Sequence, residues 1–269
     1  MITGIAWSEG IWGEPDSLHL PLSDRGLQLG DGLFETVLIR DGCPQLLNEH
    51  LARWCISAGQ LGMRNPPAQS QLEALIAEAV ERANLNQGDG ALRLNWSRGS
   101  SQTRGLDAPT EIKPRFWFTL LPWTPTFMPI DVIISRHERR NADSLLSQCK
   151  HFGYAQAIQA RSEARVANAD DALLLNTKGD LCCGTAANLL VHRQGAWLTP
   201  PLNSGCLPGI MRGKALKLGK SAEHWLGNAL QFGDQALLIN SLGCRPIQRC
   251  DGLSLVPCSE AETLWHSLL

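Results

Sequence analysis

The sequence predicts an α+β protein of two lobes, for three reasons. Its 269 residues lie near the upper limit for one hydrophobic core. Helix-like and strand-like hydrophobic patterns follow one another along the chain. Residues 121–129 contain three prolines, and proline interrupts both helices and central strands. We therefore expect a small α+β lobe over residues 1–121, a proline-rich linker over 122–129 and a larger, β-rich lobe over 130–269.

The small lobe is predicted from a strand-like run followed by helical spacing. Residues 35–40 form the strand-like run, and residues 47–61 place Leu51, Trp54 and Ala58 on one helical face. A second helix is expected over residues 71–83, with further strands over 91–97 and 115–120. These elements suffice for a small sheet with helices packed on it.

The larger lobe is predicted to contain more strands than the small one. Pro208 marks the start of one of its helices, because proline suits the first helical position. The expected strands cover residues 130–135, 172–176, several short runs within 179–198, and 236–240. The expected helices cover residues 154–167, 208–216 and 259–268.

Charge and hydropathy argue against two classes of partner. The 24 Lys and Arg nearly balance the 26 Asp and Glu, and the longest basic stretch is residues 136–140, so we expect no nucleic-acid partner. No apolar run reaches the ~20 residues that span a bilayer, and the first ten residues lack a secretion signal. We expect a cytoplasmic protein with no membrane partner.

The nine cysteines do not indicate a disulfide framework or a metal site. Their number is odd, and none are spaced as Cys-x-x-Cys. The phosphate-binding loops and the hydrolase, kinase and metalloprotease motifs are also missing from the sequence. We therefore expect no metal, and nucleotide-dependent activities lose their main support.

Four segments remain, and each alone has an ordinary structural explanation: residues 30–36, 50–53, 150–154 and 206–212. Arg53 could form an exposed helical salt bridge with Glu49 four residues earlier. Lys150 could be one of the many solvated lysines. Residues 207–212 could simply begin a helix, although free N–H groups there would also suit a phosphate. The order and spacing of the segments carry more information than any one of them.

Taken together, these segments resemble the class IV, or fold type IV, pyridoxal-phosphate enzymes: branched-chain aminotransferases, D-amino acid aminotransferases and 4-amino-4-deoxychorismate lyases. The resemblance runs from about residue 22 to residue 247, and further matches lie at residues 23–26, 97–99, 104–105, 170–175, 184–188, 199–200 and 240–241. It implies the two-lobed fold of the D-amino acid aminotransferase type, with the larger lobe carrying the cofactor lysine. It also implies pyridoxal 5'-phosphate as cofactor, a small-molecule amino-group substrate and a homodimer.

The resemblance assigns a role to each matched position. Lys150 would be the catalytic residue: it would bind the cofactor covalently, because a neutral amine is a good nucleophile, and after exchange with the substrate amine it would move the proton on the amine-bearing carbon. Arg53 would bind the cofactor phosphate through charge-assisted bonds. The other implied cofactor contacts are the backbone N–H groups of Ile210 and Met211, the hydroxyl of Ser241, and Tyr154.

Two positions depart from the family pattern. Five residues before the motif asparagine, Asn188, the family has a glutamate that bonds the pyridine nitrogen, whereas this chain has Cys183. A neutral thiol is a weak hydrogen-bond partner, so we expect a weaker pull on electrons by the cofactor. Gly153 stands where asparagine is common. These changes imply altered chemistry, a substitute acid from elsewhere, or lost catalysis.

Finer motifs favour one reaction within the family. Arg104 is followed by Gly105 rather than by the Arg-x-His of D-amino acid aminotransferases, and Thr36 replaces the glycine usual in branched-chain enzymes. The Arg-Gly pairs at 98–99 and 104–105 resemble the lyases, with Arg104 as a substrate-binding residue. We therefore expect a 4-amino-4-deoxychorismate lyase, which releases pyruvate and forms 4-aminobenzoate for folate synthesis. An aminotransferase for branched-chain or D-amino acids and a catalytically silent homologue are the alternatives.

Overall fold

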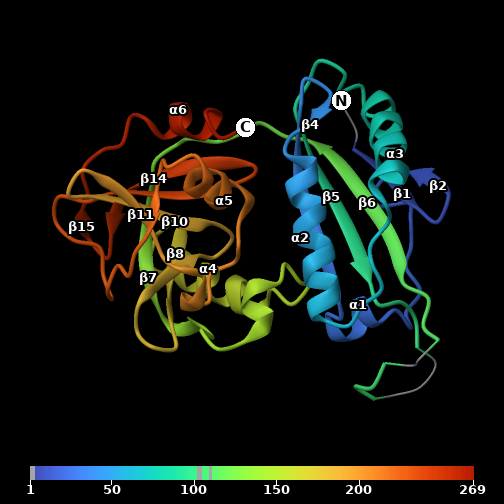
Figure 1. Cartoon of the computed structure of the whole chain (residues 1–269), viewed down its shortest axis with the longest axis horizontal. Helices are drawn as coiled ribbons and strands as arrows, with labels where there is room; N and C mark the ends of the chain where they lie inside the picture. Colours follow the sequence, from blue (N-terminus) through green and yellow to red (C-terminus); the bar gives the residue numbers. More distant parts are fainter. Residues whose placement is uncertain (1–3, 102–104, 109–110) are drawn as a thin grey trace. The chain divides into compact units, whose positions relative to one another are not determined.

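The chain folds into two compact units. The computed structural model describes residues 4–101, 105–108 and 111–269. Unit 1 comprises Met1–Thr124 together with Lys150–Gly153, and unit 2 comprises Pro125–Cys149 and Tyr154–Leu269. The sequence placed Lys150 in the lobe over residues 130–269, whereas its short segment packs with unit 1. Figure 1 labels most of the elements of both units.

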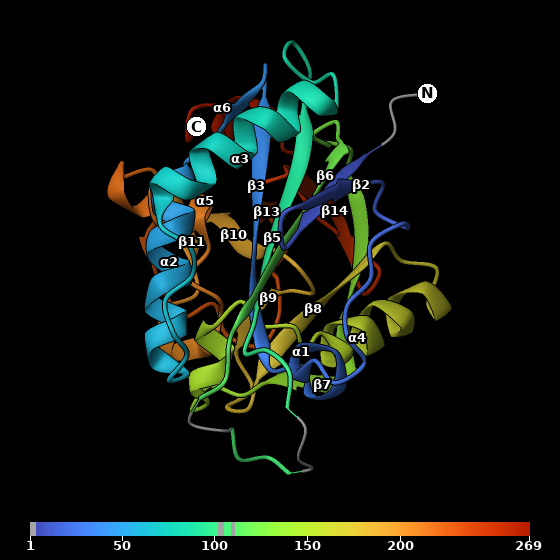
Figure 2. The same ribbon diagram turned by 90° about the vertical axis from the view of Figure 1, so that its right-hand side faces the viewer.

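Unit 1 is built on an antiparallel sheet. Within the described residues this sheet has six strands, each paired antiparallel with its neighbours, and Figure 2 shows its long central strands side by side. The order is β2 (Ile11–Gly13), β1 (Ile5–Ser8), β6 (Arg115–Pro122), β5 (Gly90–Ser97), β3 (Gly32–Arg40) and β4 (Cys43–Pro44). The three strands predicted for this lobe are confirmed, each within a few residues of its expected ends.

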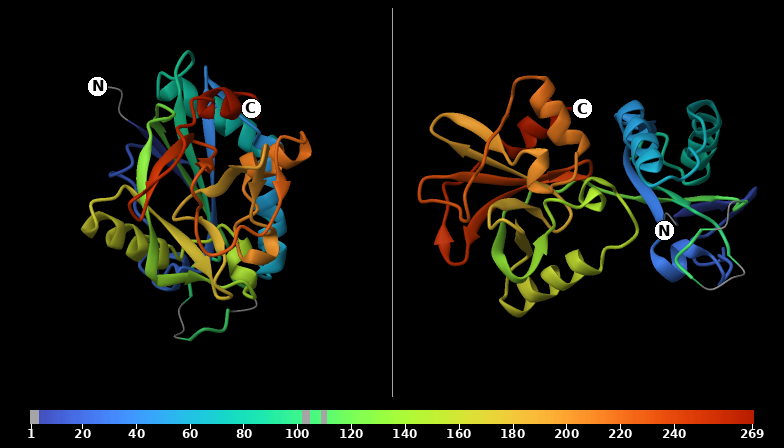
Figure 3. Two further views of the ribbon diagram at one scale, coloured as in Figure 1. Left: turned by 90° about the vertical axis from the view of Figure 1, so that its left-hand side faces the viewer. Right: turned by 60° about the horizontal axis from the view of Figure 1, so that its bottom comes forward.

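Two helices cover one face of this sheet. Helix α2 (Leu47–Gln60) and helix α3 (Gln69–Arg82) lie on the same side of the strands, and the short helix α1 (Arg25–Leu29) precedes β3 (Figure 3). On α2 the buried Leu51, Trp54 and Ala58 recur every three or four residues, as the sequence predicted. The strand residues opposite them supply the other half of the core.

Unit 2 contains a sheet that closes on itself. Its described residues form nine strands in one sheet, and the pairing of β9 with β10 links the two ends of the run from β10 to β9. The strand order is β12 (Ala222–Glu223), β11 (Ala196–Thr199), β10 (Asn188–Arg193), β13 (Gln235–Asn240), β14 (Gly243–Cys250), β7 (Ile130–Arg140), β8 (Asp171–Asn176) and β9 (Leu181–Gly184), with β15 (Leu253–Ser254) beside β14.

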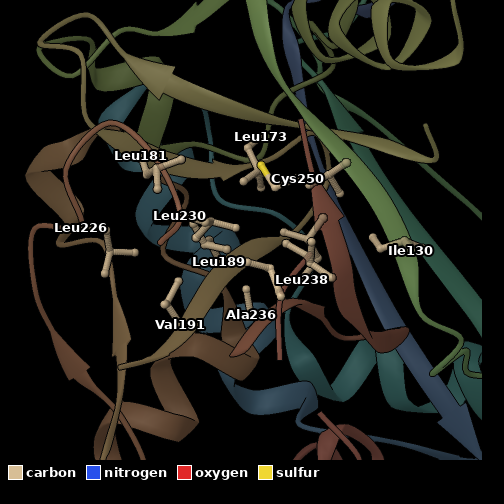
Figure 4. Close-up of a cluster of buried hydrophobic side chains, with 13 residues drawn as sticks. Ile130, Leu173, Leu181, Leu189, Val191, Leu226, Leu230, Ala236, Leu238 and Cys250 are labelled. Atoms are coloured by element: carbon tan, nitrogen blue, oxygen red, sulfur yellow. The ribbon is translucent and has the colours of Figure 1, made fainter. Parts of the chain in front are cut away.

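The core of unit 2 lies inside this closed sheet. Leu173, Leu189 and Leu238 from three different strands point into one buried cluster, to which Leu226 and Leu230 add side chains from a loop (Figure 4). The helices are α4 (Ala155–Val166), α5 (Ile210–Lys217) and α6 (Ala261–His266), with 3₁₀ turns at Leu145–Gln148 and Leu202–Ser204. The α+β class predicted from the sequence is confirmed. Across the described ranges, every helix is too short or too polar to cross a membrane.

Candidate functional site

A short strand-like segment attaches Lys150 to β3 in unit 1. The N–H of Phe34 donates to the carbonyl oxygen of Lys150 (2.9 Å), and the N–H of Phe152 donates to the carbonyl oxygen of Gly32 (3.0 Å). An isolated antiparallel bridge lies between these two bonds. The backbone of Lys150 is therefore fixed by the first residues of β3, which are more than one hundred positions earlier in the sequence.

Glycines make room for the ring that follows Lys150. A Cβ on Gly32 would lie 2.3 Å from the ring of Phe152, and a Cβ on Gly26 would lie 2.8 Å from it. The ring of Trp117 packs on the same phenylalanine, with centroids 5.7 Å apart. Two of the glycines in the matched motifs thus serve the close packing of the lysine segment.

The amine of Lys150 lies against an aromatic ring. Its Nζ is 4.4 Å from the ring centroid of Phe34, and the guanidinium carbon of Arg93 is 3.6 Å from the same centroid. Phe34 is buried, Lys150 is half-buried and Arg93 is exposed. An aromatic face attracts cations, so the buried ring of Phe34 helps to hold the side chain of Lys150 in place.

The next residue of β3 is a fully buried carboxylate that binds two basic side chains of α2. Glu35 Oε1 accepts a hydrogen bond from Arg53 Nε (2.8 Å), and Oε2 accepts one from Arg53 Nη2 (2.5 Å). Oε2 also accepts a bond from His50 Nδ1 (2.7 Å). His50 and Arg53 lie three residues apart and so share one face of the helix. We call Glu35, His50 and Arg53 the buried triad.

Burial and charge set the ionisation of the buried triad. Burial alone would raise the pKa of Glu35, but Arg53 and the hydrogen bond from His50 outweigh it and lower this pKa to about 2. Burial lowers the pKa of His50, and the positive charges of Arg53 and Lys150 lower it further. Glu35 raises this pKa through its hydrogen bond and its charge, but the net shift is downward. At neutral pH the carboxylate is ionised and His50 is neutral, with its proton on Nδ1 because a carboxylate only accepts.

The triad corrects one expectation and adds a residue that the sequence reasoning missed. Arg53 is not an exposed surface residue: its side chain is only 9% exposed and is held by Glu35. Glu35 was not recognised as part of a site. The available signal was a lone carboxylate within the apolar strand run, since a buried charge needs a partner.

In unit 2 the motif asparagine, Asn188, holds the segment that leads into helix α5. Asn188 lies opposite Cys183 where β10 pairs with β9, and its Nδ2 donates to the carbonyl oxygen of Leu207 (2.9 Å). A Cβ on Gly209 would lie 1.9 Å from Asn188 Oδ1. Only glycine lets the chain pass this close to the asparagine before the helix begins.

The residues expected to contact a phosphate open helix α5. Ile210 and Met211 are its first two residues, and Gly209 at the N-cap has no side chain with which to cap it. The first N–H groups of a helix have no acceptor within the helix and carry its positive end. Elsewhere in unit 2, Tyr154 is the N-cap of α4, and Ser241 lies in the turn between β13 and β14; both are half-buried.

Cys183 lies in a buried cluster of small side chains. Its neighbours there include Cys182, Cys206 and Ala160. The hydrogen bond with Cys182 lowers the pKa of the Cys183 thiol, burial raises it, and the charge of Arg140 lowers it again, with a net lowering. The pKa of Cys182 moves the opposite way, raised by the same bond and by burial. Of the two neighbouring thiols, Cys183 is the more acidic.

A second ionic network, which the sequence reasoning also missed, holds the turn after Cys183. Thr185 Oγ1 donates to Asp171 Oδ1 (2.6 Å), and Arg161 donates from Nη2 to Asp171 Oδ2 (2.6 Å) and to Thr185 Oγ1 (2.6 Å). Asp171 and Thr185 are buried. The network ties the turn to β8 and to helix α4.

The predicted site residues divide between the two units. Lys150 and Arg53 belong to unit 1, whereas Tyr154, Cys183, Ile210, Met211 and Ser241 belong to unit 2. Arg104, the predicted substrate-binding residue, lies outside the described residues.

Comparison with known proteins shows to which family the chain is related. The family model described as amino-transferase class IV matches residues 32–250. A Methanocaldococcus jannaschii protein provisionally named branched-chain-amino-acid aminotransferase is 32% identical over 199 residues, which are 73% of this chain and 68% of that protein. A Schizosaccharomyces pombe protein provisionally named aminodeoxychorismate lyase is 32% identical over 213 residues, 78% of this chain and 85% of that protein.

A solved structure extends the similarity to nearly the whole chain. A Legionella pneumophila protein provisionally named 4-amino-4-deoxychorismate lyase superposes with a TM-score of 0.82 and 26% identity, over 93% of this chain and 94% of that one. The fold and the motifs that match in the same order along the chain therefore define a fold type IV pyridoxal-phosphate enzyme. The chain belongs to the class IV aminotransferase family.

The donor groups of this chain suit the family's cofactor. Pyridoxal phosphate carries an aldehyde, which an amine such as that of Lys150 can bind, and a phosphate, which suits the guanidinium of Arg53 and the first turn of α5. Cys183, the residue that the resemblance matches to the family's carboxylate, is a buried thiol.

Proposed function

We propose that the chain is a pyridoxal-phosphate-dependent 4-amino-4-deoxychorismate lyase that releases pyruvate and forms 4-aminobenzoate for folate synthesis. Two findings support this choice. The Arg-Gly pairs and the Lys150-His151 dipeptide are lyase-like, and the relatives from S. pombe and L. pneumophila carry lyase names.

In this proposal each residue has a defined task. Lys150 would hold the cofactor through its amine until the substrate amine replaces it, and the released amine would then remove the proton from the amine-bearing carbon of the substrate. Arg53, the N–H groups of Ile210 and Met211, and the hydroxyl of Ser241 hold the phosphate. When bound, pyridoxal phosphate supplies a sink for the electrons of that carbon. Tyr154 orients the cofactor ring, and Arg104 binds a substrate carboxylate.

The buried Cys183 is the observation that favours a lyase over an aminotransferase. Without a carboxylate at this position the pyridine nitrogen is less readily protonated, and the cofactor is a weaker electron sink. Loss of the enolpyruvyl group turns the substrate ring aromatic, which itself favours the reaction. An elimination therefore tolerates the thiol better than a transamination does.

The alternative is a class IV aminotransferase acting on branched-chain or D-amino acids. The similarity to the M. jannaschii protein supports it. A silent homologue that keeps the fold is the third possibility, consistent with the thiol of Cys183. In each case we place the chain in the cytoplasm, where its nine free thiols are stable, and as a homodimer, the usual state of the family.

Incubation with 4-amino-4-deoxychorismate tests the proposal directly. A lyase forms 4-aminobenzoate and pyruvate in equal amounts without any acceptor, and a Lys150→Ala variant forms neither. An aminotransferase needs a 2-oxo acid acceptor and releases no pyruvate from this substrate. Turnover only with an amino acid and a 2-oxo acid would support the alternative, and no turnover with either substrate set would support the silent homologue.

A further inference from the structure

We propose that Glu35 is a positioning residue for phosphate binding: its buried carboxylate fixes the guanidinium of Arg53 so that the opposite end of this guanidinium meets the cofactor phosphate. The inference rests on the proposed function, in which Arg53 binds that phosphate. Glu35 itself touches neither the phosphate nor the reacting atoms.

The contact between Glu35 and Arg53 occupies one edge of the guanidinium. Nε donates to Oε1 at 2.8 Å and Nη2 donates to Oε2 at 2.5 Å. A guanidinium carries five N–H donors in one plane, and this contact uses two of them on its Nε side. A second two-point contact is therefore confined to the Nη1–Nη2 end.

The two partners come from different elements, so the sheet determines the orientation of a helical side chain. Glu35 lies on β3, where it pairs with Leu94 of β5, and Arg53 lies on α2. A free arginine side chain loses considerable rotamer entropy when a ligand orders it. Because Glu35 already orders Arg53, phosphate binding avoids most of this cost.

His50 completes the arrangement from one turn earlier on α2. Its Nδ1 donates to Oε2 of Glu35 at 2.7 Å, so the carboxylate is held by three bonds and cannot turn freely. His50 and Glu35 are both almost completely buried. The carboxylate is thus a rigid support, although its negative charge also repels a phosphate. The proposal requires the orienting effect to exceed this repulsion.

The same two-point contact occurs in unit 2, away from the predicted site residues, and provides a matched control. Arg193 Nε donates to Asp234 Oδ1 (2.9 Å), and its Nη2 donates to Oδ2 (2.8 Å). Asp234 is buried. An Asp234→Asn variant therefore reports what the loss of a buried carboxylate does to this chain in general.

The experiment compares two ligands that differ only in the phosphate. Cofactor-free protein is titrated with pyridoxal phosphate and with pyridoxal, and the ratio of the two affinities isolates the phosphate contact. In Glu35→Gln this ratio should fall about tenfold to a hundredfold, the usual effect of one charge-assisted contact. Pyridoxal affinity should change less than about twofold, and Asp234→Asn should leave the ratio unchanged. Circular dichroism and melting curves verify folding.

Comparison with Arg53 variants separates this inference from the proposed function. Arg53→Lys keeps the charge but cannot form the two-point contact, so adding Glu35→Gln to it should lower the ratio little further. If Arg53→Lys and Arg53→Ala both leave the ratio intact, the phosphate role of Arg53 is wrong. If they lower it while folded Glu35→Gln leaves it unchanged or raises it, only the positioning role is wrong.

A second variant covers the case in which Glu35→Gln does not fold. Glu35→Asp keeps the charge and withdraws the carboxylate by one methylene, so it should also lower the ratio of the two affinities. A retained ratio in folded Glu35→Asp contradicts the proposal in the same way.

Discussion

The buried triad makes the stability of the protein in acid depend on two residues, His50 and Glu35. The lowered pKa of His50 favours folding above about 6.5, because the unfolded chain takes up a proton below that value and the folded chain does not. The pKa of Glu35 is lowered from 4.5 to about 2, and this shift adds about 3 kcal/mol to the free energy of unfolding above pH 4.5. That contribution disappears as the pH falls from 4.5 through about 2.

We predict that His50→Asn weakens the dependence of the free energy of unfolding on pH below about 6.5. Asparagine retains an N–H donor for Glu35 but takes up no proton, so the free energy of unfolding should fall less steeply between pH 6.5 and 4.5. The slope should decrease by at most about 1.4 kcal/mol per pH unit. Urea unfolding at several pH values measures it, with the exposed His224→Asn as control. An unchanged slope would mean that His50 is not buried in the neutral form.

The resemblance matches Cys183 to a glutamate of the family, and Cys183→Glu tests what this difference does. If the thiol faces the ring nitrogen, a carboxylate there adds a charged hydrogen bond, and side transamination should rise roughly tenfold to a hundredfold. The lyase rate should change less, because aromatisation already favours that step. A folded variant with unaltered activities and an unaltered cofactor spectrum would show that Cys183 does not face the ring.

At the scale of elements, the sequence predicted helices better than strands. The apolar spacing over residues 47–61 predicted α2, which spans Leu47–Gln60. Strand β14 was missed because it contains Pro246, and a proline argues against an internal strand. The β1–β2 hairpin was missed because its turn places Glu9 at a φ of 49°, a conformation that glutamate does not signal.

The candidate site was predictable where it is local and not where distant segments meet. The matched motifs singled out Arg53 and Lys150, but no spacing along the chain reveals that Glu35 of β3 binds the basic pair on α2. The attachment of the Lys150–Gly153 segment to β3 was missed for the same reason. Both depend on pairings that exist only after the sheet has formed.

The attachment of the lysine segment gives a prediction for β3. In Gly32→Ala the added methyl group meets the ring of Phe152, so stability should fall by about 1–3 kcal/mol and cofactor affinity should fall with it. Gly59→Ala in α2 is the matched control, because its added Cβ meets nothing within 4 Å apart from its chain neighbours and the backbone of its own helix. That variant should gain about 0.5–1 kcal/mol. Equal effects of the two substitutions on cofactor affinity would contradict the packing role of Gly32.

At the scale of the whole molecule, the chain leaves unit 1 after Thr124 and contributes Lys150–Gly153 to it again later. Unit 1 is therefore incomplete without a segment from the middle of the sequence. This segment carries the lysine on which every enzymatic interpretation depends. Its place in unit 1 differs from the expectation that the larger lobe carries the lysine.

The most direct measurement is the identity of the residue that carries the cofactor. Protein saturated with pyridoxal phosphate is reduced with borohydride, digested and analysed by mass spectrometry. Our account predicts a single pyridoxyl-phosphate adduct, located on Lys150 and absent from Lys150→Ala. An adduct on another lysine, or no adduct in saturated protein, would contradict it.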